Sequence, residues 1–206
     1  MSSPQNASAI LLAAGGSTRL GRPKQLLPWN GTTLIGWTIR QLVEADCRRL
    51  IIVIGAYESE IREHCLTVGN SQIEIVTNLD WREGQATSLR VGIQSALARK
   101  DLGATLIAVC DQPLITSLHY RELVSKVEGL GYDAAATEYR EGLGVPVCAS
   151  VSALQNLAAA VGESGAKKWL RAQSSASVCG VACTDAALDI DTELDYQERL
   201  KHGEVV

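Results

Sequence analysis

The sequence predicts an α/β fold, a three-layer sandwich in which helices cover both faces of a mostly parallel sheet. Two observations lead to this prediction. Short apolar runs that end in glycine or polar residues alternate along the chain with longer stretches in which apolar residues recur at the helical period. These longer stretches have lengths suited to crossover connections, which parallel neighbouring strands require.

The predicted strands are short and apolar. The first, Ala9 to Ala14, runs into Gly15-Gly16 and is typical of a buried strand followed by a tight turn. The other predicted strands are 50–54, 73–76, 105–110, 134–137, 145–149, 178–182 and 188–190. Of these, 134–137 and 145–149 are separated by a glycine-containing connection and are expected to form a hairpin.

The first predicted helix follows Thr32 or Thr33, either of which can cap it, and continues to about Ala45. Further helices are predicted at 57–66, 87–100, 117–128, 151–160 and 166–173, and a closing helix begins at about Glu193. Neither repeats nor low-complexity tracts interrupt the pattern, and 206 residues fit within one domain. We therefore expect a single domain over 1–206.

The composition excludes several classes of protein. Hydrophobic residues make up 46% and charged residues 20%, which is typical of a globular domain and not of a disordered or fibrous chain. A net charge of −4 without a Lys/Arg cluster argues against a nucleic-acid surface. The first residues do not resemble a signal peptide, and no apolar run is long enough to span a bilayer. We expect a cytoplasmic protein that binds neither nucleic acid nor membrane.

Polar residues follow the first strand and the strand 105–110, where ligands bind in parallel sheets. After the first strand, Gly15 and Gly16 allow backbone N–H groups to approach a polyphosphate, and Ser17 and Thr18 add hydroxyl donors. The spacing matches neither the Walker A loop nor the dinucleotide glycine pattern. Arg19 and Lys24 then supply positive charge, and Asp111-Gln112-Pro113 follows the strand 105–110, so both stretches carry groups suited to phosphate and metal.

The segment 12–24, Leu12-Ala13-Ala14-Gly15-Gly16-Ser17-Thr18-Arg19-Leu20-Gly21-Arg22-Pro23-Lys24, resembles a family signature. It is similar to the L-A-A-G-x-S-x-R-M-G-x-P-K motif of the molybdenum cofactor cytidylyltransferases, in the MobA-like NTP transferase superfamily, with Leu20 as a conservative departure. The resemblance continues in order through Asn78-x-x-Trp81-x-x-Gly84-x-x-x-Ser88, Asp111-Gln112-Pro113, Gly144-x-Pro146, Glu163-Ser164-Gly165-Ala166 and Asp189-Ile190-Asp191-Thr192.

The resemblance implies a Rossmann-like fold of the nucleotide-diphospho-sugar transferase type. An NTP-binding half at about 8–115 would precede an acceptor-binding half at about 116–206. The implied reaction transfers CMP from CTP to the terminal phosphate of molybdopterin with Mg²⁺, or Mn²⁺ in its place, and a client molybdoenzyme is a further implied partner. CTP is expected over GTP because Ala13-Ala14-Gly15 and Pro23-Lys24 resemble the cytidylyl enzymes.

The resemblance also assigns roles to single residues. Arg19, Lys24 and Asp111 are the expected catalytic residues, and Gln112, Gly144 and Pro146 the expected acceptor-binding residues. Trp81 either stacks on the ligand or packs within the protein. The expected nucleotide-binding residues are Leu12, Ala13, Ala14, Gly15, Gly16, Ser17, Thr18, Arg19, Lys24, Asn78, Gly84 and Ser88.

Asp111 and Asp191 are the expected metal ligands. An aspartate at a parallel strand end is well placed to hold Mg²⁺ against a phosphate. The alternatives are a turn-forming aspartate before proline for Asp111, and capping of the last helix for Asp191 or Asp189. Asp189 is a further candidate ligand.

Two other functions stay open at the level of sequence. The first is a nucleotidyltransferase with another acceptor or base, such as a GTP-using molybdopterin guanylyltransferase or an enzyme that acts on a sugar 1-phosphate or phosphocholine. The second is a non-catalytic carrier of nucleotide or cofactor. Lys167 departs from the family pattern after Glu163-Ser164-Gly165-Ala166, which leaves the acceptor less constrained than the nucleotide.

Overall fold

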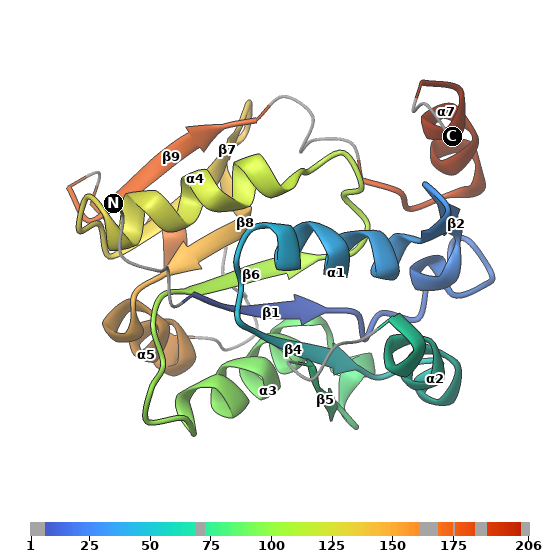
Figure 1. Ribbon diagram of the computed structural model, residues 1–206, viewed down its shortest axis with the longest axis horizontal. Helices are drawn as coiled ribbons and strands as arrows, with labels where there is room; N and C mark the ends of the chain where they lie inside the picture. Colours follow the sequence, from blue (N-terminus) through green and yellow to red (C-terminus); the bar gives the residue numbers. More distant parts are fainter. Residues whose placement is uncertain (1–6, 69–72, 161–168, 175, 184–188, 203–206) are drawn as a thin grey trace.

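The computed structural model describes residues 7–68, 73–160, 169–174, 176–183 and 189–202. Within these ranges seven strands form one sheet in the order β5-β4-β1-β6-β8-β7-β9 (Figure 1). β8 is antiparallel to both of its neighbours, and every other neighbouring pair is parallel. The strands are β1 Ser8–Leu12, β4 Arg49–Ile54, β5 Ile73–Thr77, β6 Thr105–Val109, β7 Ala134–Tyr139, β8 Gly142–Ala149 and β9 Val178–Ala182. The mostly parallel sheet and the β7–β8 hairpin are confirmed.

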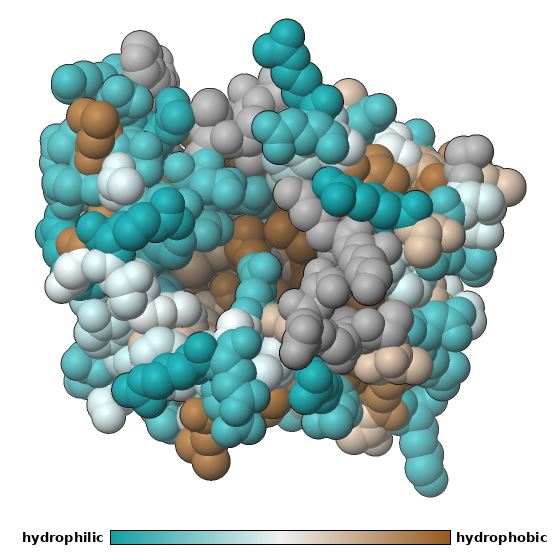
Figure 2. Space-filling model, turned by 180° about the vertical axis from the view of Figure 1, so that it is seen from behind, coloured by the Kyte–Doolittle hydropathy of each residue, from teal (hydrophilic) through white to brown (hydrophobic). Residues whose placement is uncertain are grey.

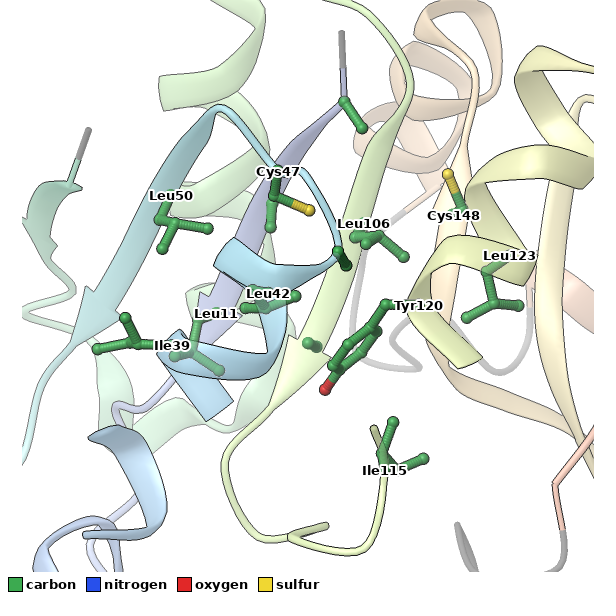
Figure 3. Close-up of a cluster of buried hydrophobic side chains, with 14 of the residues drawn as sticks. Leu11, Ile39, Leu42, Cys47, Leu50, Leu106, Ile115, Tyr120, Leu123 and Cys148 are labelled. Atoms are coloured by element: carbon green, nitrogen blue, oxygen red, sulfur yellow. The ribbon is translucent and has the colours of Figure 1, made fainter. Parts of the chain in front are cut away.

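Helices cover both faces of the sheet, as predicted. The side chains of β1 alternate: Leu11 joins a buried cluster with α1 (Leu34–Glu44), α2 (Glu58–Val68) and α4 (Ser117–Glu128), whereas Ile10 joins a second cluster with α3 (Gln85–Leu97) and α5 (Val151–Ala160). Figure 3 shows the first cluster, which includes Leu11, Leu42 and the fully buried Tyr120. Both faces of β1 are therefore core, which explains the run of apolar residues from Ala9 to Leu12.

A third, smaller cluster lies beyond the strand ends. It contains Leu27, Trp29, Leu34, Ile190 and Tyr196, which come from a two-stranded hairpin, the start of α1, the C-terminal helix, and the residues just before the hairpin and that helix. The hairpin is β2 Pro28–Trp29 and β3 Thr32–Thr33, and the helix is α7 Glu193–His202. The Tyr196 hydroxyl donates to the carbonyl of Pro28 over 2.8 Å. The last helix is thus fixed to the segment that follows the glycine-rich loop.

Several predictions need correction. Asp189 and Ile190 are not in a strand, and Leu188 lies outside the described residues. Residues 169–171 are helical, but the predicted start of that helix at Ala166 also lies outside them. Helix α3 begins two residues earlier than predicted, directly after Gly84, because the short 3₁₀ helix Trp81–Glu83 turns the chain there. Thr33, and not Thr32, caps α1, since its hydroxyl accepts from the N–H of Gly36 at 3.1 Å.

Two further observations concern membrane-spanning helices and the cysteines. No helix among the described residues has the length and apolar character needed to cross a bilayer. All six cysteines are free; Cys47, Cys65, Cys110 and Cys148 are buried, and Cys179 and Cys183 are half-buried.

Candidate active site

The glycine-rich loop leaves the end of β1 and returns to a short 3₁₀ helix, Lys24–Leu26. Ser17 has a positive φ of 48° and closes a turn in which its carbonyl accepts from the N–H groups of Leu20 and Gly21. The Ser17 hydroxyl accepts from the N–H of Lys24 at 3.1 Å and donates to Oε1 of Gln25 at 3.4 Å. This hydroxyl, predicted to meet a phosphate, therefore bonds within its own loop.

Lys24 lies between two carboxylates from distant parts of the chain. Its Nζ is 2.6 Å from Oδ2 of Asp111, two residues after the end of β6, and 3.0 Å from Oδ1 of Asp191, just before α7. Nζ also donates to the carbonyl of Ile190 at 3.3 Å. Arg19 bonds the second oxygen of Asp191 over 2.7 Å. The predicted catalytic and metal-binding residues thus meet at one place beyond the strand ends.

The charges in this cluster stabilise one another. Burial by itself would lower the pKa of Lys24, but the attraction and hydrogen bond of Asp111, followed by Asp191, raise it well above its usual value. Burial opposes ionisation of Asp191, yet the hydrogen bond and charge of Lys24, together with Arg19, lower its pKa overall. Lys24 therefore stays charged at neutral pH, as a phosphate-binding ammonium must.

The two aspartates fit a divalent metal site. Mg²⁺ binds oxygen ligands and in phosphate-transfer sites takes one or two carboxylates, with substrate phosphates and water completing its shell. Asp111 and Asp191 supply two such carboxylates, and the described residues contain no cluster of three His, Cys, Asp or Glu side chains that would hold an ion alone. This donor set suits an ion that arrives with a polyphosphate.

Helix capping does not account for Asp191. The hydroxyl of Thr192 accepts from the N–H of Asp195 at 3.2 Å, and the carboxylate of Asp195 accepts from the N–H of Thr192 at 2.7 Å. This reciprocal pair caps α7. Asp189 instead accepts from Nε2 of Gln112 at 3.0 Å, and burial, followed by the charges of Asp111 and Asp191, raises its pKa.

A cavity of about 320 Å³ lies beside this cluster. It is walled by the end of β1 and the glycine-rich loop, by the turn before α3 and by the end of β6. Figure 2 shows that the face turned away in Figure 1 is also hollowed near its centre, with apolar residues on the floor. The described residues that line the cavity are Leu12, Ala13, Ala14, Gly15, Gly16, Lys24, Gln25, Trp81, Arg82, Gly84, Gln85, Ser88, Val109, Cys110 and Asp111.

Most of the predicted nucleotide-binding residues line this cavity, but four do not. Thr18 and Arg19 are exposed outside it, and Ser17 bonds within the loop. Asn78 is only 2% exposed, and its side-chain amide donates to the hydroxyls of Thr87 and Ser88 at 2.8 and 2.9 Å. Asn78 thus joins the end of β5 to the first turn of α3.

Sequence reasoning missed Gln25, Arg82, Gln85, Val109 and Cys110 as residues of the cavity. Arg82 stacks on Trp81 with its guanidinium carbon 4.4 Å from the ring centroid. Trp81 lines the cavity and also packs against Gly16. The packing is close, since a Cβ on Gly16 would lie 2.9 Å from the Trp81 ring. The only signal for Gln25 was its position directly after Lys24.

Gln112, one of the expected acceptor residues, is joined to the β7–β8 hairpin by hydrogen bonds. Nε2 of Gln112 donates to the Tyr139 hydroxyl at 2.9 Å, and this hydroxyl donates to the carbonyl of Val145. Gly144 is buried beneath the Tyr139 ring, where an added Cβ would lie 3.0 Å from a ring carbon. The end of β6 is thereby joined to the β7–β8 hairpin.

Pro146 is held by the neighbouring strand β7. The hydroxyl of Thr137 donates to its carbonyl at 2.9 Å, and Nε2 of His119 lies 2.9 Å from the same hydroxyl. Pro146 is buried, so it shapes this region through its backbone and neighbours. The motif Glu163-Ser164-Gly165-Ala166 lies outside the described residues.

A glycine-rich loop, a lysine and two aspartates gathered at the strand ends of this sheet define a nucleotidyltransferase of the Rossmann-like α/β type. The chain belongs to the MobA-like NTP transferase family, whose domain model matches residues 9–178.

Two curated relatives match nearly the whole chain. It is 30% identical over 194 residues to a nicotine blue oxidoreductase of Paenarthrobacter nicotinovorans, covering 90% of this chain and 92% of that protein. It is 26% identical over 188 residues to the molybdenum cofactor cytidylyltransferase of Escherichia coli K12, covering 91% and 92%. The family thus contains relatives of different named activity.

Solved structures agree with the fold. The crystal structure of Rv0371c from Mycobacterium tuberculosis H37Rv superposes with a TM-score of 0.79 at 27% identity, covering 97% of this chain and 100% of that one. A structure of the same protein in complex with manganese gives a TM-score of 0.74 at 26% identity, covering 96% and 100%.

Proposed function

We propose that this protein transfers CMP from CTP to the terminal phosphate of molybdopterin, giving molybdopterin cytosine dinucleotide and pyrophosphate. One observation supports it above the others. Lys24, Asp111 and Asp191 meet at the edge of a cavity walled by the Leu12–Gly16 segment, which resembles the cytidylyl enzymes. The molybdenum cofactor cytidylyltransferase of Escherichia coli, which is similar over nine-tenths of both chains, supports the same acceptor.

In this proposal the chain itself does mostly positioning and charge neutralisation, which dominate phosphoryl transfer. Backbone N–H groups of the loop bind the triphosphate, and Lys24 and Arg19 neutralise its charge. Asp111 and Asp191 would hold a divalent ion, which when bound adds electrophilic activation of the α-phosphate. The acceptor enters beside Gly144 to Pro146, so that its phosphate oxygen attacks opposite the departing pyrophosphate.

An oxidoreductase is the second candidate, favoured by the relative at 30% identity. The cluster argues for the transferase, because a lysine between two carboxylates suits phosphate and metal, whereas hydride transfer chiefly needs a redox cofactor placed against its substrate. Oxidation of NADH or NADPH with an electron-accepting dye, measured beside pyrophosphate release, separates the two candidates.

The direct test is pyrophosphate release from CTP, GTP, ATP and UTP with Mg²⁺ or Mn²⁺, with and without molybdopterin. Turnover that needs both CTP and molybdopterin is the expected result. Turnover with GTP in place of CTP would contradict the base assignment, and turnover that needs a sugar 1-phosphate would contradict the acceptor.

Asp111→Asn tests the metal assignment within that assay. We expect a loss of at least about 100-fold in kcat, as for removal of one electrostatic contact to a transition state. Asp101→Asn is the matched control, because Asp101 pairs with Arg49 on the exposed surface and does not line the cavity. Unchanged turnover of Asp111→Asn would contradict the assignment.

A further inference from the structure

Gln25 is an unusual residue for a loop between a strand and a hairpin. Its side chain is polar, yet only 1% of the residue is exposed. Its Nε2 donates to two backbone carbonyls of the glycine-rich loop, Ala13 at 2.9 Å and Gly15 at 2.8 Å. Its Oε1 accepts from the Ser17 hydroxyl at 3.4 Å. The Gln25 side chain thus bonds every second residue of the loop from Ala13 to Ser17.

These bonds decide where the loop's N–H groups point. In a planar trans peptide the C=O of one residue and the N–H of the next point in opposite directions. Because the carbonyls of Ala13 and Gly15 are directed toward Gln25, the N–H groups of Ala14 and Gly16 are directed away from it. Ala14 and Gly16 both line the cavity.

The same residue fixes the neighbouring cation. Gln25 lies in the single 3₁₀ turn Lys24–Leu26, and the Ser17 hydroxyl that it binds accepts from the backbone N–H of Lys24. The backbone of Lys24 and the directed N–H groups therefore share one anchor. A polyphosphate bound at this loop would meet both, so loss of the anchor would disturb both together.

We propose that Gln25 is a positioning residue that orients the N–H groups of Ala14 and Gly16 and the backbone of Lys24 to receive the triphosphate of the nucleotide. This inference rests on the proposed function insofar as the ligand is a nucleoside triphosphate. Gln25 also lines the cavity, but its side-chain amide is already bonded within the loop, so it acts on the ligand through the loop backbone. Loss of Gln25 should therefore weaken the binding of the phosphates. It should leave the binding of the nucleoside part of the ligand unchanged.

The test compares Gln25→Met with Gln41→Met. Methionine has nearly the volume of glutamine but cannot make these bonds. Gln41 is the matched control: it is also buried, its Oε1 accepts from the N–H of Ser117 at 2.8 Å, and it does not line the cavity. Thermal unfolding of each variant reports the general loss of stability that both substitutions cause.

Three probes are titrated with Mg²⁺ present: CTP and inorganic tripolyphosphate by calorimetry, and cytidine by ligand-detected NMR. We expect Gln25→Met to weaken CTP and tripolyphosphate by about 10–100-fold, as outer supporting residues do, and to leave cytidine unchanged. Gln41→Met should bind all three like the wild type. Gln25→Asn, which keeps an amide on a shorter stem, should lie between Gln25→Met and the wild type.

Two results would overturn the inference while the proposed function stands: Gln25→Met binding CTP like the wild type, or losing CTP and cytidine in equal measure. A wild type that binds tripolyphosphate but no nucleotide would refute the proposed function alone, and the inference would then be judged on tripolyphosphate. A wild type that binds neither would refute both.

Discussion

Replacing Lys24 with methionine should make the stability of the protein depend on divalent metal ions. In the wild type the ammonium of Lys24 neutralises the carboxylates of Asp111 and Asp191. The variant leaves Asp111 and Asp191 without the ammonium that joins them. The three side chains are 14%, 20% and 34% exposed for Lys24, Asp111 and Asp191. Removing one partner of a fully buried ion pair costs about 3–5 kcal/mol, and partial exposure reduces this to about 2–3 kcal/mol here.

For a chain of this size such a loss lowers Tm by about 4–12 °C. A divalent ion should restore part of it, because Nζ no longer occupies the position between the two carboxylates. At an ion concentration ten times the Kd, the recovery is about 1.4 kcal/mol. We therefore expect Mg²⁺ or Mn²⁺ to raise the Tm of Lys24→Met by more than that of the wild type.

Thermal unfolding followed by circular dichroism, with and without the ion, measures both effects. Lys126→Met is the control, because Lys126 pairs with Glu122 on the surface at 3.7 Å and such pairs contribute less than about 1 kcal/mol. Equal stabilisation of the wild type and Lys24→Met by the ion would refute the reasoning. A variant whose Tm without the ion equals that of the wild type would also refute it.

Two further substitutions test the surroundings of the site. Gly55→Ala would place a Cβ 2.7 Å from Cβ of Trp81 and 2.9 Å from that of Ala14, so we expect urea denaturation to show a loss of about 1–3 kcal/mol; unchanged stability would mean that Trp81 packs less tightly than described. Thr192→Ala removes the hydroxyl that accepts from Asp195 and should cost about 0.5–2 kcal/mol in the same assay, whereas Thr192→Ser should be close to neutral.

The sheet and one side of the site could be predicted because their signals are local. An apolar run followed by glycines identifies β1 and its loop, and the strand-end rule identifies Asp111 without any knowledge of its partners. Asp191 came only from the family motif, since nothing near it in sequence indicates a metal. Its meeting with Lys24 depends on the docking of α7 against the β2–β3 hairpin.

What sequence could not predict depends on contacts between distant residues. The sequence Leu188 to Ile190 suggested a strand, but Ile190 is outside any strand and is buried in the third cluster together with Tyr196. Asn78 was expected at the nucleotide, yet its amide is used to hold α3. Burial of a lone glutamine such as Gln25 has no sequence signature, because its bonding partners are the carbonyls of a loop whose course is set by tertiary packing.

Lys24 and Asp191, which form an ion pair, are 167 positions apart in the chain. Among the described residues, those that line the cavity are made by the ribosome no later than Asp111, whereas Asp191 follows much later. At about 5–20 residues per second, roughly 4–16 s separate the two aspartates during synthesis. These lining residues are thus synthesised well before the second carboxylate, which the segment leading into α7 later brings to Lys24.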